Sequence, residues 1–313
     1  MLPNGCSIVM EKKARQYILD NIHGAIYNKN RIVREINSYT GYIPTISQFI
    51  ENNGQDIRIL YQGSNCWTSL KRAAGRITYV DDDITKRLEK GMATLLHHNT
   101  GSFIRFVRDF VKGSNAYKDE ENEVYALMLY YALFQDRLDR TGFDSIYDAL
   151  SLLHQDRYAY FKQEIAEIFA YLAEHLQIKT KPIGEDIMPK LELYGCYTRE
   201  EIFTIVGRQT ATKKMQGSVT GVFNLPEHNA TLLFVTLNKS EKDFSPSTQY
   251  NDYLINEDFF HWQSQNTDSH QNNGGKRYTM QSETDNRIIL FVREEKNDGY
   301  GNTCPFHCFG LVD

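Results

Sequence analysis

The sequence predicts an α+β chain in which an N-terminal all-α helical bundle is followed by a small, mostly antiparallel β-barrel. Apolar residues recur at spacings of three and four through residues 11–175, as in amphipathic helices. Short β-branched and apolar runs bounded by turn residues then take over. The charge balance changes in the same region, because residues 1–190 carry 24 Lys and Arg against 24 Asp and Glu, and residues 191–313 carry 11 against 16. We therefore place two domains, at residues 1–190 and 191–313.

The helices of the first domain follow from their apolar stripes and from their composition. The strongest are expected over Glu123–Leu138 and Tyr158–Leu176, which are rich in Ala, Leu, Met and Glu and have no interior Gly or Pro. An acidic run over residues 118–123 precedes the first of these, where the helix dipole favours negative charge. Shorter helices are expected over residues 11–22, Arg31–Tyr39 and Ile46–Asn52.

The turn at residues 40–45 gives this bundle a pattern similar to a helix-turn-helix. Gly41 offers a C-cap, and Pro44 prevents one continuous helix. A DNA-binding version places its second helix in a groove, and Ile46–Asn52 has no basic residue to offer there. Two packed helices of a bundle are the preferred interpretation, and a true helix-turn-helix is the alternative.

The strands of the second domain are predicted from β-branched content and alternation. Ala230–Asn238 and Arg287–Arg293 are expected to be buried strands, and Gly217–Leu225 and Phe260–Gln265 to be further ones. The stretch Thr198–Val206 is predicted to be a helix that begins with a capping box of Thr198 and Glu201. Short strands with one or two helices in so few residues favour a small barrel.

Composition and targeting patterns exclude several classes of protein. The five cysteines are odd in number and scattered, which favours a reducing cytoplasm over a secreted disulfide framework. The first ten residues lack the pattern of a signal peptide. The longest apolar run, Val124–Phe134, is about half of the ~20 residues that a membrane helix needs. A formal net charge of −5 means that any nucleic-acid binding must rest on a local patch or pocket. We expect a cytoplasmic chain with no membrane partner.

Catalytic motifs are absent from the sequence. It has no phosphate-binding loop, no His-Glu-x-x-His and no Gly-x-Ser-x-Gly. Residues 304–308, Cys-Pro-Phe-His-Cys, resemble a fragment of a metal site but have no second pair at a suitable spacing, so buried thiols in a strand explain them more simply. His97 and His98 fall in a predicted helix, where neighbouring side chains point apart, so we treat that pair as incidental. No catalytic residue, metal or cofactor is therefore expected in this chain.

Between Lys239 and Asn266 the sequence interleaves aromatic and amide side chains. Strand alternation places Phe260, Trp262, Ser264 and Asn266 on one face. A nucleobase needs such a surface, because rings stack on its faces and amides satisfy its edges. The alternative is that the amides bond to the barrel backbone and Trp262 fills the core.

The same residues carry a resemblance to a known family. Residues 232–253, 258–267 and 290–299 resemble a domain of unknown function that follows the motor in bacterial DEAD/DEAH-box helicases. Many of those proteins have an N-terminal phospholipase-D-type nuclease, among them modification-dependent (Type IV) restriction enzymes similar to SauUSI. Residues 1–10 resemble the end of the motor's second RecA-like lobe, and Arg31–Gly75 resembles the helical connector after it.

The resemblance implies a function for each domain. Residues 1–190 would be a helical coupler, and residues 191–313 an SRA/PUA-like barrel that reads a modified (5-methyl- or 5-hydroxymethyl-) cytosine in double-stranded DNA by base flipping. The helicase and nuclease domains of the same polypeptide would be the partners, and ATP and Mg²⁺ would belong to that parent motor. The chain would then be the C-terminal part of a larger enzyme, and its barrel would lack the last strand.

The candidate site has two sets of residues. In the base pocket we expect Tyr250, Tyr253 and Trp262 to stack, and Phe260 to contact a C5 methyl group. The pocket amides expected to read the base edge are Asn238, Gln265 and Asn266. The cations expected on the DNA backbone are Lys213, Lys214, Lys239, Lys242, Lys276 and Arg277. The alternative function is a structural coupler that docks motor and nuclease by protein–protein contacts, which the zero charge balance of residues 1–190 favours.

Overall fold

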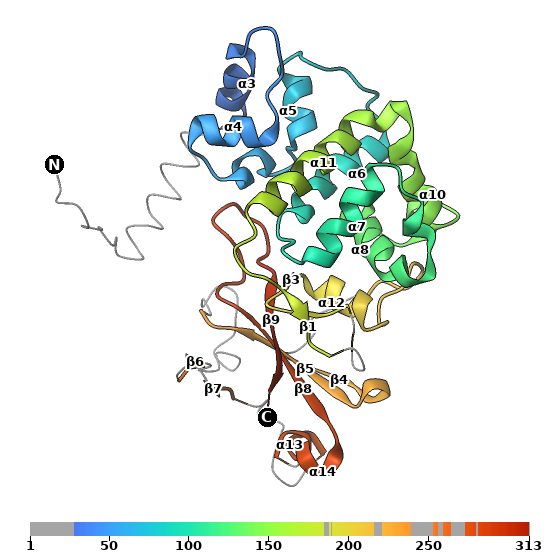
Figure 1. The fold of residues 1–313 in the computed structure, drawn as a ribbon, viewed down its shortest axis with the longest axis vertical. Coiled ribbons are helices and arrows are strands. Elements are labelled where there is room, and N and C mark those ends of the chain that lie inside the picture. Colours follow the sequence, from blue (N-terminus) through green and yellow to red (C-terminus); the bar gives the residue numbers. More distant parts are fainter. Residues whose placement is uncertain are drawn as a thin grey trace, which may run out of the picture.

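Most of the helices gather at one end of the molecule and the sheet lies at the other, with α13 and α14 beyond the sheet, as Figure 1 shows. The computed structural model describes residues 28–184, 188, 190–215, 221–238, 253–255, 259–263, 273–279 and 281–312. Predictions that fall on other residues, including the helix expected over 11–22 and the motor-like residues 1–10, lie outside this part of the chain.

The helical half contains α-helices and short 3-10 helices. The α-helices are α3 (Lys29–Ser38), α4 (Ile46–Asn53), α5 (Trp67–Ala73), α6 (Asp83–Gly91), α7 (Gly101–Val111), α8 (Glu123–Phe134), α9 (Leu138–Thr141), α10 (Ile146–Ser151) and α11 (Ala159–Glu174). The 3-10 helices are η2 (Ile57–Tyr61), η3 (Met92–Leu95), η4 (Ala116–Lys118), η5 (Glu120–Asn122), η6 (Leu152–His154) and η7 (Asp156–Tyr158).

Helix α8 is the centre of this half. Every residue from Tyr125 to Phe134 is buried, as expected for a helix that is apolar all round. It packs against α6, α7 and α10. The helix ends four residues before the predicted Leu138, because Gln135 adopts a left-handed conformation with φ of 62°.

The turn after α3 joins two packed bundle helices. Thr45 caps α4 in a capping box with Gln48, and Ile46, Phe49 and Ile50 are buried. The Ile46 backbone N–H donates to the Glu167 carboxylate of α11 over 2.9 Å. The start of α4 is therefore fixed inside the bundle, as the preferred interpretation of this turn requires.

The second half is built on a five-stranded sheet in the order β3-β9-β8-β5-β4. Its strands are β3 (Cys196–Tyr197), β4 (Val222–Leu225), β5 (Ala230–Thr236), β8 (Arg287–Arg293) and β9 (Phe306–Val312). Strands β5 and β8 pair in parallel, with Ala230 opposite Arg287, and the other neighbours are antiparallel. The remaining elements are β1 (Lys181–Pro182), β2 (Glu192–Leu193), α12 (Arg199–Ile205), η8 (Pro226–His228), β6 (Tyr253–Leu254), β7 (Phe260–His261), α13 (Asn273–Thr279) and α14 (Gln281–Thr284).

Within the described residues this sheet is open, because its edge strands β3 and β4 do not pair with each other. The closed barrel was not found and stays a prediction. Three strands are shorter than expected: β7 covers two residues of the predicted Phe260–Gln265, β4 begins at Val222, and β5 ends at Thr236, two residues before the predicted Asn238. The parallel pair was not foreseen, and it requires the long crossover between residues 237 and 286 that contains α13 and α14.

The two central strands are buried on both faces, which explains their unbroken apolar runs. One face, with Leu232, Phe234 and Phe291, belongs to a single hydrophobic core that continues into the helical half. The opposite face carries a second, smaller apolar cluster, which we call the outer cluster and which consists of Leu233, Val235, Ile288, Leu290 and Val292.

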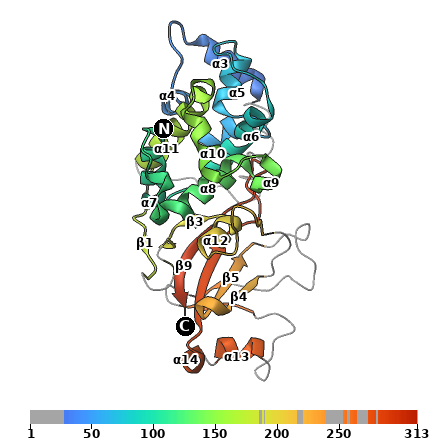
Figure 2. The same ribbon diagram turned by 90° about the vertical axis from the view of Figure 1, so that its right-hand side faces the viewer.

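Helix α12 lies between the helical half and the sheet in both views (Figures 1 and 2). Thr198 and Glu201 form the predicted capping box at its start. Phe203 of α12 is buried and packs its ring against Phe223 and Phe234 of the sheet, at centroid distances of 4.8 and 6.1 Å. None of the helices in the described residues is long and apolar enough to cross a membrane.

Candidate functional site

Three aromatic side chains cover the outer cluster. Phe260 and Trp262, on and just after β7, and Tyr278 of α13 are half-buried and pack against it. The rings of Trp262 and Tyr278 meet edge to face, with centroids 4.9 Å apart and planes at 72°. We call these three residues the outer aromatic face. The structure therefore brings together two of the predicted pocket residues, Phe260 and Trp262, and adds Tyr278, which the sequence reasoning did not include.

Helix α13 also places cations beside the outer aromatic face. Lys276 is exposed, and Arg277 is half-buried. The Asn286 side chain fixes this helix to the sheet, because it donates to the Arg277 carbonyl over 3.2 Å and accepts from the Thr231 hydroxyl over 3.1 Å. In Figures 1 and 2, α13 lies at the end of the sheet away from the helical half. Two predicted DNA-backbone residues are thus on the same helix as Tyr278, whose ring contacts that of Trp262.

Asn238 lies at the opposite end of the central strands. Its backbone N–H donates to the Glu294 carbonyl over 2.8 Å, just after β5 and β8 end. Its side-chain amide is 3.3 Å from the Glu294 carboxylate. Asn286, which fixes α13, instead precedes β8, and a strand of seven residues spans about 20 Å. Asn238 and α13 therefore lie at opposite ends of β8, and the structure does not bring this predicted pocket amide beside that helix.

The lysines at residues 213 and 214 lie against the helical half. The Lys214 ammonium donates to the Gln135 carbonyl at the end of α8 over 2.7 Å, while Lys213 is exposed. A lysine on the last carbonyls of a helix also interacts favourably with the helix dipole. Four of the predicted DNA-backbone cations lie in the described part of the chain, and they form two groups. Lys276 and Arg277 are on α13, and Lys213 and Lys214 lie beside the end of α8.

The remaining predicted residues are placed only in part. Tyr253 lies in β6, opposite His261 of β7. Five of the predicted residues lie outside the described part of the chain: Tyr250, Gln265, Asn266, Lys239 and Lys242.

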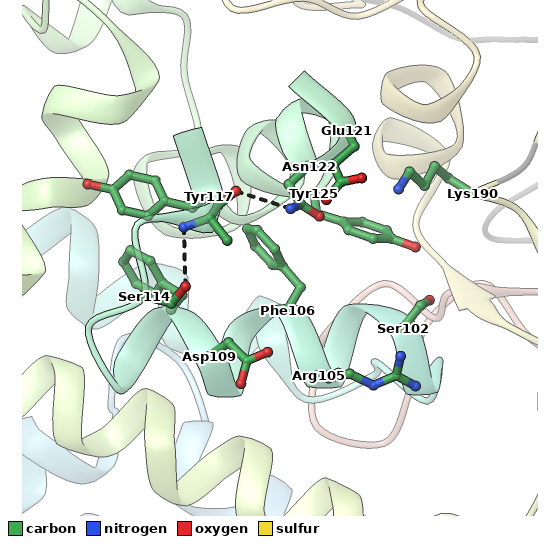
Figure 3. Close-up of a pocket in the computed structure, with 12 residues that line it drawn as sticks. Ser102, Arg105, Phe106, Asp109, Ser114, Tyr117, Glu121, Asn122, Tyr125 and Lys190 are labelled. Carbon is green, nitrogen blue, oxygen red and sulfur yellow. Dashed lines mark hydrogen bonds between the residues drawn. The ribbon is translucent and has the colours of Figure 1, made fainter. Parts of the chain in front are cut away.

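A cavity in the helical half was not anticipated from the sequence. It has a volume of about 320 Å³ and lies between α7, the turns before α8 and Lys190, as Figure 3 shows. The Lys190 ammonium lies 4.4 Å from the centroid of the Tyr125 ring. Arg105 and Asp109 of α7 and Glu121 add charges of both signs. The lining therefore favours no single sign of charge in a ligand.

A buried carboxyl group lies near this cavity. Glu192 of β2 accepts hydrogen bonds from the hydroxyls of Ser102, which lines the cavity, and Thr180. Burial raises the pKa of Glu192, and the hydrogen bond from Thr180 and the charge of Arg105 oppose this only in part. The arrangement ties β2 to α7, and a carboxyl group with a raised pKa beside a cavity is a candidate for function.

Hydrogen bonds reinforce the contact between the two halves. The Asn99 side chain donates to the Tyr194 carbonyl and accepts from the Cys196 N–H, over 2.9 and 2.6 Å. The Tyr131 hydroxyl donates to the Thr210 carbonyl over 2.6 Å. We call this set of contacts, together with the shared core around α12, the joint. Its residues come from distant parts of the sequence, so local patterns gave no signal for it.

His97 and His98 belong to the joint, and their treatment as incidental helix residues was wrong. They follow η3 in a turn, so helical spacing does not separate them, and their rings lie 4.3 Å apart. Both approach the Glu201 carboxylate of α12. Burial lowers the pKa of His98 to about 3, so its imidazole is neutral at pH 7. Burial alone would raise the pKa of Glu201, but the charge and hydrogen bond of His97 and the hydrogen bond from the Thr198 N–H oppose it, and the pKa of Glu201 is lowered.

Comparison with known proteins covers the second half alone. No curated protein and no solved structure matches the chain. One family model matches, and its first residue lies directly before β2. Residues 191–313, which contain α12, the five-stranded sheet and the outer aromatic face, thus match the family described as "Domain of unknown function (DUF3427)".

Proposed function

We propose that residues 191–313 recognise a modified cytosine, 5-methyl- or 5-hydroxymethylcytosine, in double-stranded DNA. In this proposal the helical half relays recognition to a helicase motor and a nuclease of the same parent polypeptide, as in Type IV enzymes similar to SauUSI. The observation that carries the proposal is the outer aromatic face, one of whose residues, Tyr278, shares α13 with the exposed Lys276. The family match is consistent with it, because the resemblance to helicase-associated domains falls on the same residues.

The chemistry of the outer aromatic face suits a base turned out of the duplex. Removing a base from the stack costs a few kcal/mol. Stacking on an aromatic side chain returns about 1–3 kcal/mol per base. Trp262 and Tyr278 are half-buried, so part of each ring reaches solvent while the remainder is held on the outer cluster. Rigid aromatic side chains of this kind lose little conformational entropy when they bind.

Electrostatics limit how the DNA is held. The formal net charge of −5 rules out binding by bulk attraction, so the backbone contacts must be few and local. Each phosphate that a cation neutralises changes the slope of log K against log salt by about 0.9. Lys276 is an exposed cation at the outer aromatic face, and we expect it to supply one such contact.

A salt titration with two matched variants tests this placement. Fluorescence anisotropy would follow binding of the full chain to a duplex with one 5-methylcytosine at several salt concentrations. We expect Lys276→Ala to weaken binding and to reduce the slope by about 1. Lys112→Ala removes an exposed lysine from the helical half and should leave both quantities unchanged. Equal slopes for wild type and Lys276→Ala would remove α13 from the DNA interface.

A second candidate function is a structural coupler that docks motor and nuclease without reading bases. The core shared between the two halves favours it, because a rigid body transmits force or position. It predicts that the chain binds no DNA and that its helical half binds the motor. Calorimetric titration of the chain with the motor domain, compared with titration of the chain with modified duplex, separates the two candidates.

A further inference from the structure

We propose that His97, His98 and Glu201 form a zinc site that joins the helical half to residues 191–313. One potential ligand atom from each residue lies within 4.8 Å of the others. His97 and His98 lie between η3 and α7, and Glu201 is on α12. A metal held by all three would therefore bridge the joint covalently on both sides.

One distance between potential ligand atoms matches that in a tetrahedral zinc site, and a second is shorter by about half an ångström. Zinc–nitrogen and zinc–oxygen bonds of about 2.0–2.2 Å place two ligands of a tetrahedron about 3.3 Å apart. The His98 Nε2 atom lies 3.3 Å from the Glu201 Oε1 atom. The His97 Nε2 atom lies 2.8 Å from the Glu201 Oε2 atom, a hydrogen-bond distance, so binding needs an opening of about half an ångström there.

Both ring nitrogens of the buried His98 lack a hydrogen-bond partner among the described residues. Its side chain is 1% exposed. The Glu201 oxygen is near its Nε2 atom, but the geometry is not that of a hydrogen bond. Buried polar atoms are rarely left in this state, because each costs about 1–3 kcal/mol. A cation between the nitrogen lone pair and the carboxylate oxygen satisfies both.

The ligand types select the metal. Imidazole nitrogen suits zinc and its transition-metal neighbours, whereas Mg²⁺ and Ca²⁺ prefer an all-oxygen shell. Two histidines and one carboxylate are a common set of three protein ligands for zinc, and a water molecule completes the tetrahedron. His98 and Glu201 are both buried and the ligands come from both halves, so we assign the ion the role of holding the joint together.

Neighbouring contacts hold the ligands in place before a metal arrives. Glu201 accepts from the Thr198 N–H over 2.8 Å as part of the capping box. The His98 ring packs on Phe103, with centroids 4.2 Å apart. Asn99, the next residue, bonds to the chain on both sides of Gly195. A hydrogen bond to a ligating carboxylate, such as that from the Thr198 N–H, raises metal affinity by about 10- to 100-fold.

Metal analysis of the full chain tests the site. The purified protein would be stripped with a chelator, dialysed against Zn²⁺ and assayed for bound zinc by mass spectrometry. We expect about one zinc per chain, with a fall to near zero in His98→Gln and at least a tenfold loss of affinity in His97→Gln. His307→Gln is the matched control, because His307 is an exposed histidine whose Nδ1 lies 3.2 Å from the Cys196 thiol. It should retain the metal.

A second measurement keeps the test independent of folding in the variants. Wild-type protein loaded with Co²⁺ should show the visible absorption of a four-coordinate site with nitrogen and oxygen ligands, and Zn²⁺ should displace it. Wild-type protein that takes up no zinc overturns the proposal. Wild-type zinc affinity in folded His97→Gln and His98→Gln variants, or loss of zinc in His307→Gln alone, overturns it as well.

Discussion

Replacing Phe234 by alanine tests whether the two halves are one cooperative unit. Phe234 lies in β5, on the sheet face turned toward α12, and is 6% exposed. Its ring stacks on Phe291 and meets Phe306 edge to face, each at a centroid distance of 5.3 Å. The Arg199 guanidinium of α12 lies 4.5 Å from its centroid. Truncation therefore removes contacts on the sheet and across to α12.

The expected cost follows from this burial. Loss of a buried phenylalanine side chain lowers the free energy of unfolding by about 3–5 kcal/mol. With a guanidinium m-value of about 6 kcal/mol/M, the midpoint should fall by about 0.5–0.8 M. Phe309→Ala is the matched control, because Phe309 lies in β9 of the same sheet and is 45% exposed. Its cost should stay within about 0.5 kcal/mol.

The assay uses a reporter in the opposite half. The chain has two tryptophans, and Trp67 of α5 is fully buried in the helical half. In a Trp262→Phe background, fluorescence reports the helical half alone. Because one core joins the halves, the Trp67 transition should move with Phe234→Ala by the full amount. A Trp67 midpoint that does not move, while circular dichroism shows a second transition at lower denaturant, would refute the shared core.

Three further predictions concern the outer aromatic face, a buried carboxyl group and the helical core. Trp262→Ala should weaken binding to modified duplex by about 5- to 150-fold in anisotropy titrations, with Phe309→Ala as the control. Burial raises the pKa of Glu192 in the folded state, so its contribution to the free energy of unfolding falls as pH rises from about 4.5 through that pKa. The slope of unfolding free energy against pH that this causes is at most about 1.4 kcal/mol per pH unit. Glu192→Gln should flatten this slope, and denaturant melts between pH 4.5 and 8 would measure it. Glu164 is fully buried and accepts from the Trp67 and Thr68 N–H groups over 2.8 and 2.7 Å. Glu164→Gln leaves one of these two N–H groups without an acceptor and should cost about 1–3 kcal/mol, against less than about 0.5 kcal/mol for the exposed Glu174→Gln; equal costs would contradict the role of these two hydrogen bonds.

Local sequence patterns were sufficient to predict the bounds of a helix or strand where the residues that fix those bounds lie within or directly beside that element. The predicted capping box of Thr198 and Glu201 fixes the start of α12, and α4 begins at Ile46, directly after the turn predicted at residues 40–45. The strand over Arg287–Arg293 was predicted with its observed bounds, because its apolar run ends at a basic residue on each side. By contrast, α8 ends at Gln135 in a left-handed conformation that glycine or asparagine usually adopts, so composition gave no warning.

Features that depend on distant residues were not predictable in the same way. The parallel pairing of β5 with β8 joins segments more than 50 residues apart, and alternation carries no information about strand direction. Glu201 meets His97 across 104 positions of sequence. The cavity between α7 and Lys190 depends on the packing of helices and turns that no motif marks. The candidate site was predicted in part, since Phe260 and Trp262 do share a surface, but Tyr278 reaches it only through the crossover.

Direct comparison of modified and unmodified DNA tests the central claim. Competition titrations at fixed salt would measure the dissociation constants of duplexes that differ by one 5-methyl or 5-hydroxymethyl group on a single cytosine. We predict that the full chain prefers one of the modified duplexes by about 5- to 150-fold, the range of a single recognised base pair. Equal affinity for all three duplexes would contradict modified-base recognition and leave the structural coupler as the function of this chain.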